Sequence, residues 1–173
     1  MTERKKKIIS TALEMFSENG YKATATNQIA KSAKVSEGLI FRHFKNKEGL
    51  LIGVLNECKE NIGKIFYPLN DLKHPKVLLK HIISIPFNTS KGNMVYCKLL
   101  NKLKWEVGEE IESIFEPIRN RAEEAFQLMK YEDPKSEAET LLLILDGVMN
   151  KVILDKFQSK LIVHDNLIKK YNV

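Results

Sequence analysis

The sequence predicts an all-α protein, on two observations. Glycine and proline are scarce, with 8 and 5 of 173 residues, and apolar residues recur at helical spacing through almost every segment between them. No segment shows the convincing alternation of apolar and polar residues that is typical of a strand. We therefore expect helices along nearly the whole chain.

The first three predicted helices are closely spaced, and the second and third are short. Residues 3–19 carry an apolar stripe that ends at a glycine. Thr26 is the expected N-cap of a helix over 26–33, and Ser36 that of the third helix, after a tight turn. Two short helices around such a turn are the outline of a helix-turn-helix, whose second helix lies in the DNA major groove.

The rest of the chain is predicted to form longer helices. Asn46 is the expected N-cap of a fourth helix, which ends before Pro68. This helix links the three N-terminal helices to the rest of the chain. Further helices are predicted over residues 75–85, 89–104, 107–129, 136–157 and 161–170. The segment 136–157 is apolar on more than one face, which indicates a subunit interface.

The charge is concentrated at the N-terminal end. The net charge is +6, and residues 1–50 hold ten lysines and arginines against five acidic residues, so the remainder is nearly neutral. This asymmetry is expected of a nucleic-acid-binding end joined to a neutral body. By itself it is equally compatible with a solvated basic face.

Composition and motifs exclude several classes of protein. Cys58 and Cys97 lie far apart without a CxxC or a nearby histidine pair, so neither a disulfide framework nor a zinc module is expected, and a cytoplasmic location fits. No apolar run approaches the roughly 18 residues of a membrane span. No catalytic triad order, phosphate loop or buried acid pair marks an enzyme, so we expect no catalytic site, no metal and no cofactor.

A set of residues at fixed spacing over positions 5 to about 51 carries a resemblance to a known family. They are Ile9, Ala12, Phe16, Glu18, Asn19, Gly20, Tyr21, Thr24, Thr26, Ile29, Ala30, Val35, Ser36, Gly38, His43, Phe44, Lys47, Glu48 and Leu50. In these positions the chain resembles the TetR family of bacterial transcriptional regulators. The resemblance implies a homodimer with a helix-turn-helix DNA-binding domain at 1–48 and a helical effector-binding and dimerisation domain at 49–173.

The resemblance and the side-chain chemistry together predict the residues that contact DNA. They are Thr24, Thr26, Gln28, Lys34, Ser36, Glu37, Gly38, Phe41, Arg42, His43 and Lys47. Thr24, Thr26 and Lys47 are expected to clamp phosphates, whereas the turn and the outer face of the third helix meet base edges or flanking phosphates.

Three of these residues carry open alternatives, and two others depart from the family's pattern. Phe41 replaces the family's usual tyrosine and removes a phosphate contact, and Arg42 either compensates with its charge or reads guanine. Gln28 contacts adenine or is a solvated surface residue, and His43 binds a phosphate or packs in the core. Lys34 stands where the family favours glycine.

The expected function is that of a ligand-responsive transcriptional regulator that binds a palindromic double-stranded DNA operator as a homodimer. We expect it to act as a repressor. A small-molecule inducer is expected, and Tyr96, Trp105, Phe115 and Phe126 are candidates to line its site, although such side chains at helical spacing are also typical of a core. The alternative is a helical regulator that acts through a protein partner and binds DNA only non-specifically.

Overall fold

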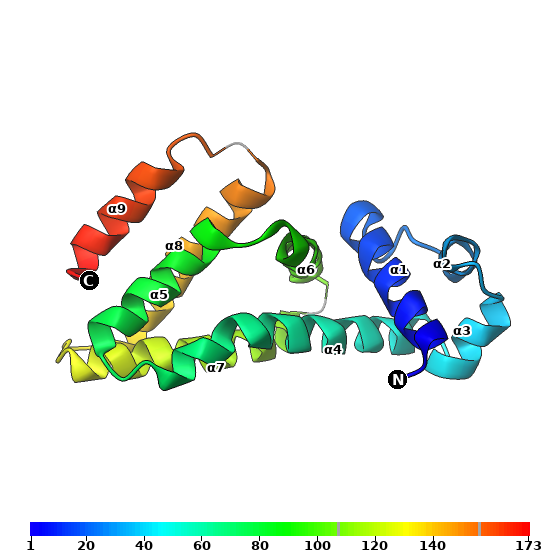
Figure 1. Cartoon of the computed structure of the whole chain (residues 1–173), viewed down its shortest axis with the longest axis horizontal. Helices are drawn as coiled ribbons and strands as arrows, with labels where there is room; N and C mark the ends of the chain where they lie inside the picture. Colours follow the sequence, from blue (N-terminus) through cyan, green and yellow to red (C-terminus); the bar gives the residue numbers. More distant parts are fainter. Residues whose placement is uncertain (107, 156) are drawn as a thin grey trace. The chain divides into compact units, whose positions relative to one another are not determined.

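The computed structural model describes residues 1–106, 108–155 and 157–173, and in these ranges every regular element is a helix (Figure 1). In chain order they are α1 (Glu3–Asn19), α2 (Thr26–Ala33), α3 (Glu37–Phe44), α4 (Lys47–Phe66), the 3-10 helix η1 (Tyr67–Asp71), α5 (Pro75–Asn88), α6 (Lys91–Leu103), α7 (Gly108–Leu128), α8 (Pro134–Ile153) and α9 (Lys160–Tyr171). The all-α prediction is confirmed. The predictions that included Val107 and Lys156 lie outside the described residues at those two positions.

Two of the three predicted helix caps are confirmed and one is wrong. The Ser36 hydroxyl accepts the Leu39 N–H at 3.3 Å, and the Asn46 side chain accepts the Gly49 N–H at 2.7 Å. The residue that caps α2, however, is Ala25, whose N–H donates to the Gln28 side chain at 3.0 Å. Thr26 is the first helical residue instead, and its side chain bonds elsewhere.

The chain forms two compact units. The first, which we call the head unit, comprises residues 1–62 and 92–111, and the second, the body unit, comprises 63–91 and 112–173. The chain passes between them three times, within α4, at the start of α6 and within α7. Helix α6 therefore belongs to the same compact unit as the N-terminal helices.

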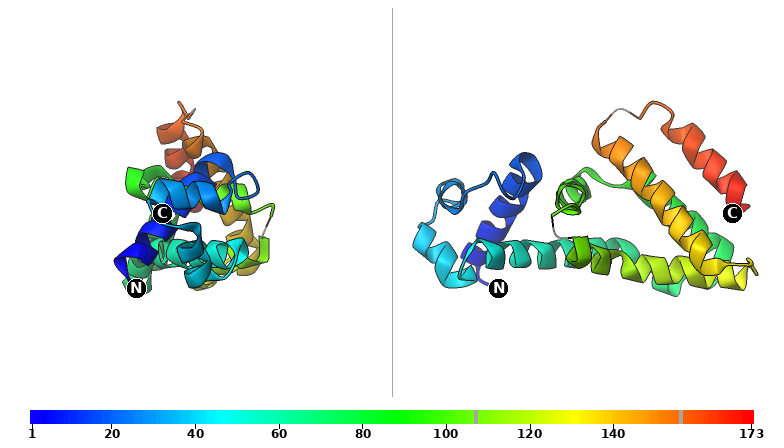
Figure 2. Two further views of the ribbon diagram at one scale, coloured as in Figure 1. Left: turned by 90° about the vertical axis from the view of Figure 1, so that its right-hand side faces the viewer. Right: turned by 180° about the vertical axis from the view of Figure 1, so that it is seen from behind.

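The head unit is built around α1, α2 and α3, which lie at the N-terminal, blue to cyan end of the chain in Figure 2. Helix α1 packs on α2, and α2 packs on α3. Their inward residues are fully or almost fully buried: Ile8, Ala12, Phe16, Ile29, Ala33, Ile40 and Phe44. The small alanines on the inner faces of α1 and α2 allow these short helices to pack closely.

The body unit is organised around α5, which packs against η1, α8 and α9. Phe126 of α7 is fully buried beside Tyr131 and Tyr171, at ring-centroid distances of 4.8 and 5.5 Å. Helix α8 has apolar residues on more than one face, as predicted: Leu141 is buried, whereas Leu143 is 73% exposed. None of the described helices combines the length and the apolarity that crossing a membrane requires.

Candidate nucleic-acid interface

The turn between α2 and α3 depends on a left-handed residue. Lys34 has φ 57° and ψ 46°, and the Val35 N–H that follows donates to the Ala30 carbonyl at 3.0 Å. Only glycine adopts this conformation without a steric cost, which explains why glycine is favoured in this turn. The Lys34 side chain is exposed at this turn.

Helix α3 has one buried face and one exposed face. Ile40 and Phe44 are buried against the rest of the head unit, at 0% and 7% exposure. On the other side Gly38 and Arg42 are exposed, and Phe41 keeps 41% of its surface accessible. A Cβ added at Gly38 would meet no heavy atom within 4 Å, so the backbone there is open to an approaching molecule.

The start of α4 holds the end of α3 at close range. A Cβ at Gly49 would lie 1.9 Å from the Phe44 carbonyl oxygen, and one at Gly53 would lie 2.9 Å from the Phe44 ring. Only glycine permits this approach at Gly49, because the obstructing atom belongs to the backbone. The two glycines thus fix the position of α3 against α4.

The start of α2 meets the start of α3 through a short hydrogen bond. The Thr26 hydroxyl donates to Oε1 of Glu37 at 2.6 Å, and both side chains are half-buried. Gln28 is exposed, with its side-chain oxygen bonded to the Ala25 N–H. Thr24 is only 1% exposed, and its hydroxyl donates to the Gly20 carbonyl at 2.8 Å.

Lys47, the first residue of α4, contacts the segment that follows α1. Its Nζ donates to the Lys22 carbonyl at 3.3 Å and lies 4.4 Å from the centre of the Tyr21 ring. Burial, with the negative charges of Glu48 and Glu106, raises the pKa of the Tyr21 phenol. The lysine is half-buried, with its ammonium group held close to the backbone of the α1–α2 connection.

The predicted DNA-contacting residues all lie in the head unit, but their exposure differs. Gln28, Lys34, Ser36, Gly38, Phe41 and Arg42 are exposed, Thr26, Glu37, His43 and Lys47 are half-buried, and Thr24 is buried. The His43 ring lies edge-on to Phe44 at 6.1 Å, in a packed position. Their contacts with DNA remain predictions.

Two exposed cations of the same domain were absent from the predicted set. Lys31 lies in the last turn of α2, and Lys45 follows α3 directly, with φ 69°. Both were present in the charge count of the first fifty residues. Neither residue lies in the spaced pattern or in the segment 34–42 whose outer face was predicted to meet DNA, so their positive charge is the sequence signal that could have indicated them.

The four aromatic residues predicted to line a ligand site fall in both units. Tyr96 and Trp105 belong to the head unit, and Trp105 is 85% exposed. Phe115 and Phe126 belong to the body unit, where Phe115 lies 6.3 Å from the Phe66 ring. Phe126 fills the core, and Phe115 is half-buried.

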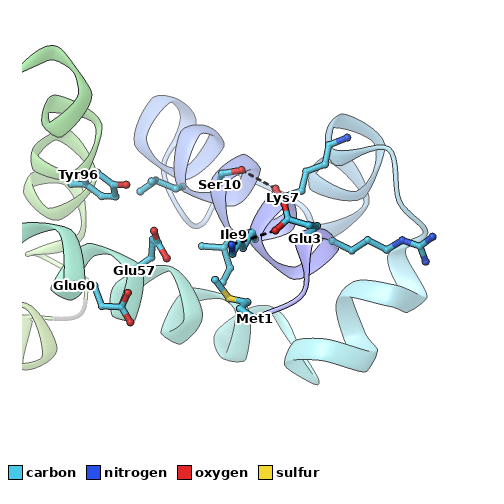
Figure 3. Close-up of a pocket in the computed structure, with 11 residues that line it drawn as sticks. Met1, Glu3, Lys7, Ile9, Ser10, Glu57, Glu60 and Tyr96 are labelled. Carbon is cyan, nitrogen blue, oxygen red and sulfur yellow. Dashed lines mark hydrogen bonds and ion pairs between the residues drawn. The ribbon is translucent and has the colours of Figure 1, made fainter.

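The head unit contains an open cavity of about 770 Å³ between α1, α4 and α6 (Figure 3). Tyr96 enters it from α6, Glu57 and Glu60 from α4, and Ile9 and Leu13 from α1. The cavity has the size of a small-molecule site, and its walls carry both acidic and basic side chains. Among the described residues no group of three or more histidines, cysteines and acids is arranged to hold a metal ion.

Comparison with known proteins supports this description of the head. Residues 8–54 match the family model of bacterial regulatory proteins of the tetR family. The uncharacterized HTH-type transcriptional regulator YvkB of Bacillus subtilis is 43% identical over 65 residues, which are 38% of this chain and 34% of that protein. The fatty acid metabolism regulator protein of the same organism is 45% identical over 90 residues, covering 50% and 45% of the two chains.

The similarity in fold extends beyond the head. The crystal structure of AibR in complex with isovaleryl coenzyme A and operator DNA superposes with a TM-score of 0.69 over 86% of each chain, at 21% identity. The sequence matches, in contrast, span less than half the length of these two curated relatives. Residues 8–54 therefore form an N-terminal domain of the type found in bacterial regulatory proteins of the tetR family.

Proposed function

We propose that this protein is a ligand-responsive transcriptional repressor that binds a palindromic DNA operator as a homodimer. The observation that carries the proposal is the exposed face of α3, presented by the burial of Ile40 and Phe44 on its other side. In helix-turn-helix proteins the second helix enters the major groove, and residues near its N-terminus contact base edges. Exposed Lys34 and Arg42 supply positive charge at this helix.

The predicted contacts divide by chemistry. Lys34, Ser36 and Lys47 offer donors to phosphates, which set affinity and register, whereas Gln28 and Arg42 offer side chains that reach base edges. The Thr24 hydroxyl is bonded to the protein's own backbone, so we assign it the positioning of the α1–α2 connection. Gly38 allows close approach, and Phe41 offers an apolar surface to a thymine methyl group.

Dimerisation is proposed to use the exposed apolar residues of α8 and α9. Leu143, Leu154, Leu161 and Ile162 are all more than 60% exposed, in or next to these two helices. Large exposed apolar side chains of this kind are candidates for an interaction site when they form a patch. A twofold dimer would present two α3 helices to half-sites about 34–36 Å apart, or a multiple of that distance.

A ligand is proposed to act by changing the separation of the two heads. Helix α6 is attached to the head: Lys102 donates to the Glu18 carbonyl at 2.5 Å, and Lys22 lies 4.0 Å from Glu106. A small molecule that favours a different separation of the two heads lowers the affinity for DNA. By the same factor, bound DNA lowers the affinity for that small molecule. Tyr96, which lines the head cavity, is our candidate contact for the ligand, and isovaleryl coenzyme A is the first probe because AibR binds it.

We propose further that the protein is not an enzyme and acts in the cytoplasm, where its DNA target lies. The family consists of regulators, and the function requires no chemical step. The protein would act by binding its operator.

The test is selection of random double-stranded DNA on the purified protein, followed by binding of the enriched sequence over a salt series. An enriched inverted repeat that is bound at least 10³-fold more tightly than random DNA, roughly the lower end for specific binders, supports the proposal. If no sequence is enriched and only weak, salt-sensitive binding remains, the proposal fails, and the exposed Phe41 would then favour regulation through a protein partner.

A further inference from the structure

The strongest unexplained feature of the head is a carboxylate placed in the middle of a basic face. Glu37 is the first residue of α3, with Lys34 before it in the turn and Arg42 after it on the helix. In the described part of the chain, no lysine, arginine or histidine nitrogen forms an ion pair with Glu37; its bonded partner is the Thr26 hydroxyl at 2.6 Å. A carboxylate here repels phosphates, so it needs a hydrogen-bond donor on the DNA.

The chemistry of the major groove restricts what that donor can be. The base edges present two kinds of N–H donor there, the N4 amino group of cytosine and the N6 amino group of adenine. Adenine is read best by a bidentate amide, because its amino group lies beside the N7 acceptor. A carboxylate cannot donate to N7 and is repelled by its lone pair, so cytosine is the better partner.

The bond to Thr26 adds a geometric restriction. It engages Oε1 of Glu37 and holds the carboxylate at the N-terminal end of α3, where helix-turn-helix proteins contact base edges. Oε2 is then the oxygen that can accept from a base amino group. The N7 lone pair beside the amino group of adenine repels it, which leaves cytosine as the better partner.

We infer that Glu37 is a specificity-determining residue that selects cytosine at one position of each operator half-site, and that Thr26 is the positioning residue for its carboxylate. This inference rests on the proposed DNA-binding function and names the base that this site selects. It also gives Thr26 a role other than the phosphate contact that the family resemblance predicts.

The first experiment compares the sequences enriched by the full-length wild-type protein and by Glu37→Gln. The wild type should require cytosine at one position per half-site, and Glu37→Gln should shift that position towards adenine, because an amide pairs with both the N6 and N7 groups. Lys45→Ala is the matched control: Lys45 is an exposed cation next to α3, and its loss should lower affinity without changing any preferred base.

The second experiment changes the DNA and leaves the protein intact. Replacing the selected cytosine by 2-pyrimidinone, which lacks the N4 amino group, should weaken wild-type binding about tenfold, as expected for loss of one charge-assisted hydrogen bond. The same replacement should have little effect on Glu37→Ala. Thr26→Val, which keeps the β-branched shape, should retain the preference for cytosine but reduce its discrimination.

The outcomes separate this inference from the proposed function. If the wild type enriches an operator and Glu37→Gln enriches the same one, with 2-pyrimidinone tolerated, the assignment of Glu37 is overturned while the repressor proposal stands. If Thr26→Val discriminates as well as the wild type, its positioning role is overturned. If the wild type enriches no sequence, both proposals fail together.

Discussion

Lys34 shows how a single residue combines a backbone cost with a functional charge. Its left-handed conformation is unfavourable for a side chain by about 1 kcal/mol, and the exposed ammonium is a candidate phosphate contact. Lys34→Gly should therefore raise the free energy of unfolding by up to about 1 kcal/mol and lower the salt dependence of DNA binding by about one ion. Lys34→Ala is the control, because it removes the charge and keeps the backbone cost. Equal stability of the two variants would contradict the account.

The two cysteines give a prediction about pH. Burial, followed by the charges of Glu57 and Cys97, raises the pKa of the Cys58 thiol to about 12, and burial raises that of Cys97 to about 11. At pH 8 both should react slowly with iodoacetamide in the folded protein and rapidly in guanidinium chloride, as mass spectrometry would detect. Since the folded state holds these protons more tightly, its stability should decrease as pH rises above about 8.5, the value of an unfolded thiol. Rapid alkylation of native Cys58 at pH 8 would refute this.

At the scale of elements, the contact between α3 and α4 depends on Gly49. Gly49→Ala places a Cβ against the Phe44 carbonyl, so α3 must shift; we expect a loss of about 1–3 kcal/mol in thermal or urea unfolding, and weaker operator binding. Gly63→Ala is the matched control in the same helix. A Cβ there meets nothing within 4 Å, and alanine should stabilise α4 by about 0.5–1 kcal/mol. If both variants gain stability, the close approach is not a restriction.

The sequence was sufficient to predict these elements where apolar period and boundary residues agree. The bounds of α1 are as predicted, α2 ends at Ala33 as predicted, and Ser36 caps α3. Helix α5, in contrast, was expected to end at Ile85. It continues to Asn88, with Pro86 inside its last turn.

Spatial contacts explain where prediction from single residues failed. Thr26 is a good N-cap by residue type, but the Gln28 side chain already satisfies the N–H of Ala25, and Glu37 is the partner of the threonine hydroxyl. Glu37 lies 11 positions away, so no local pattern indicates the bond. Likewise, helical spacing cannot distinguish a core aromatic such as Phe126 from an exposed one such as Trp105.

At the scale of the whole molecule, the proposed dimer places exposed leucines such as Leu143 in the subunit interface. Leu143→Glu replaces a side chain that is 73% exposed, so an isolated chain should lose little stability. If α8 forms the interface, the variant should sediment as a monomer and bind the operator far more weakly than the wild type. Leu128→Glu, at the end of α7 and 57% exposed, is the control and should remain dimeric. A dimeric Leu143→Glu would exclude this residue from the interface.

The membership of α6 in the head unit has a consequence for protein engineering. A chimera that grafts only the first fifty residues onto a foreign sensor would leave behind Lys102 and Glu106, which bond to Glu18 and Lys22. The graft would expose the cavity wall formed by Ile9 and Leu13 to whatever helix the new host supplies. Transplants that also carry residues 92–111 preserve those bonds. A biosensor built from this chain should therefore keep the whole head unit and replace only the helices of the body unit.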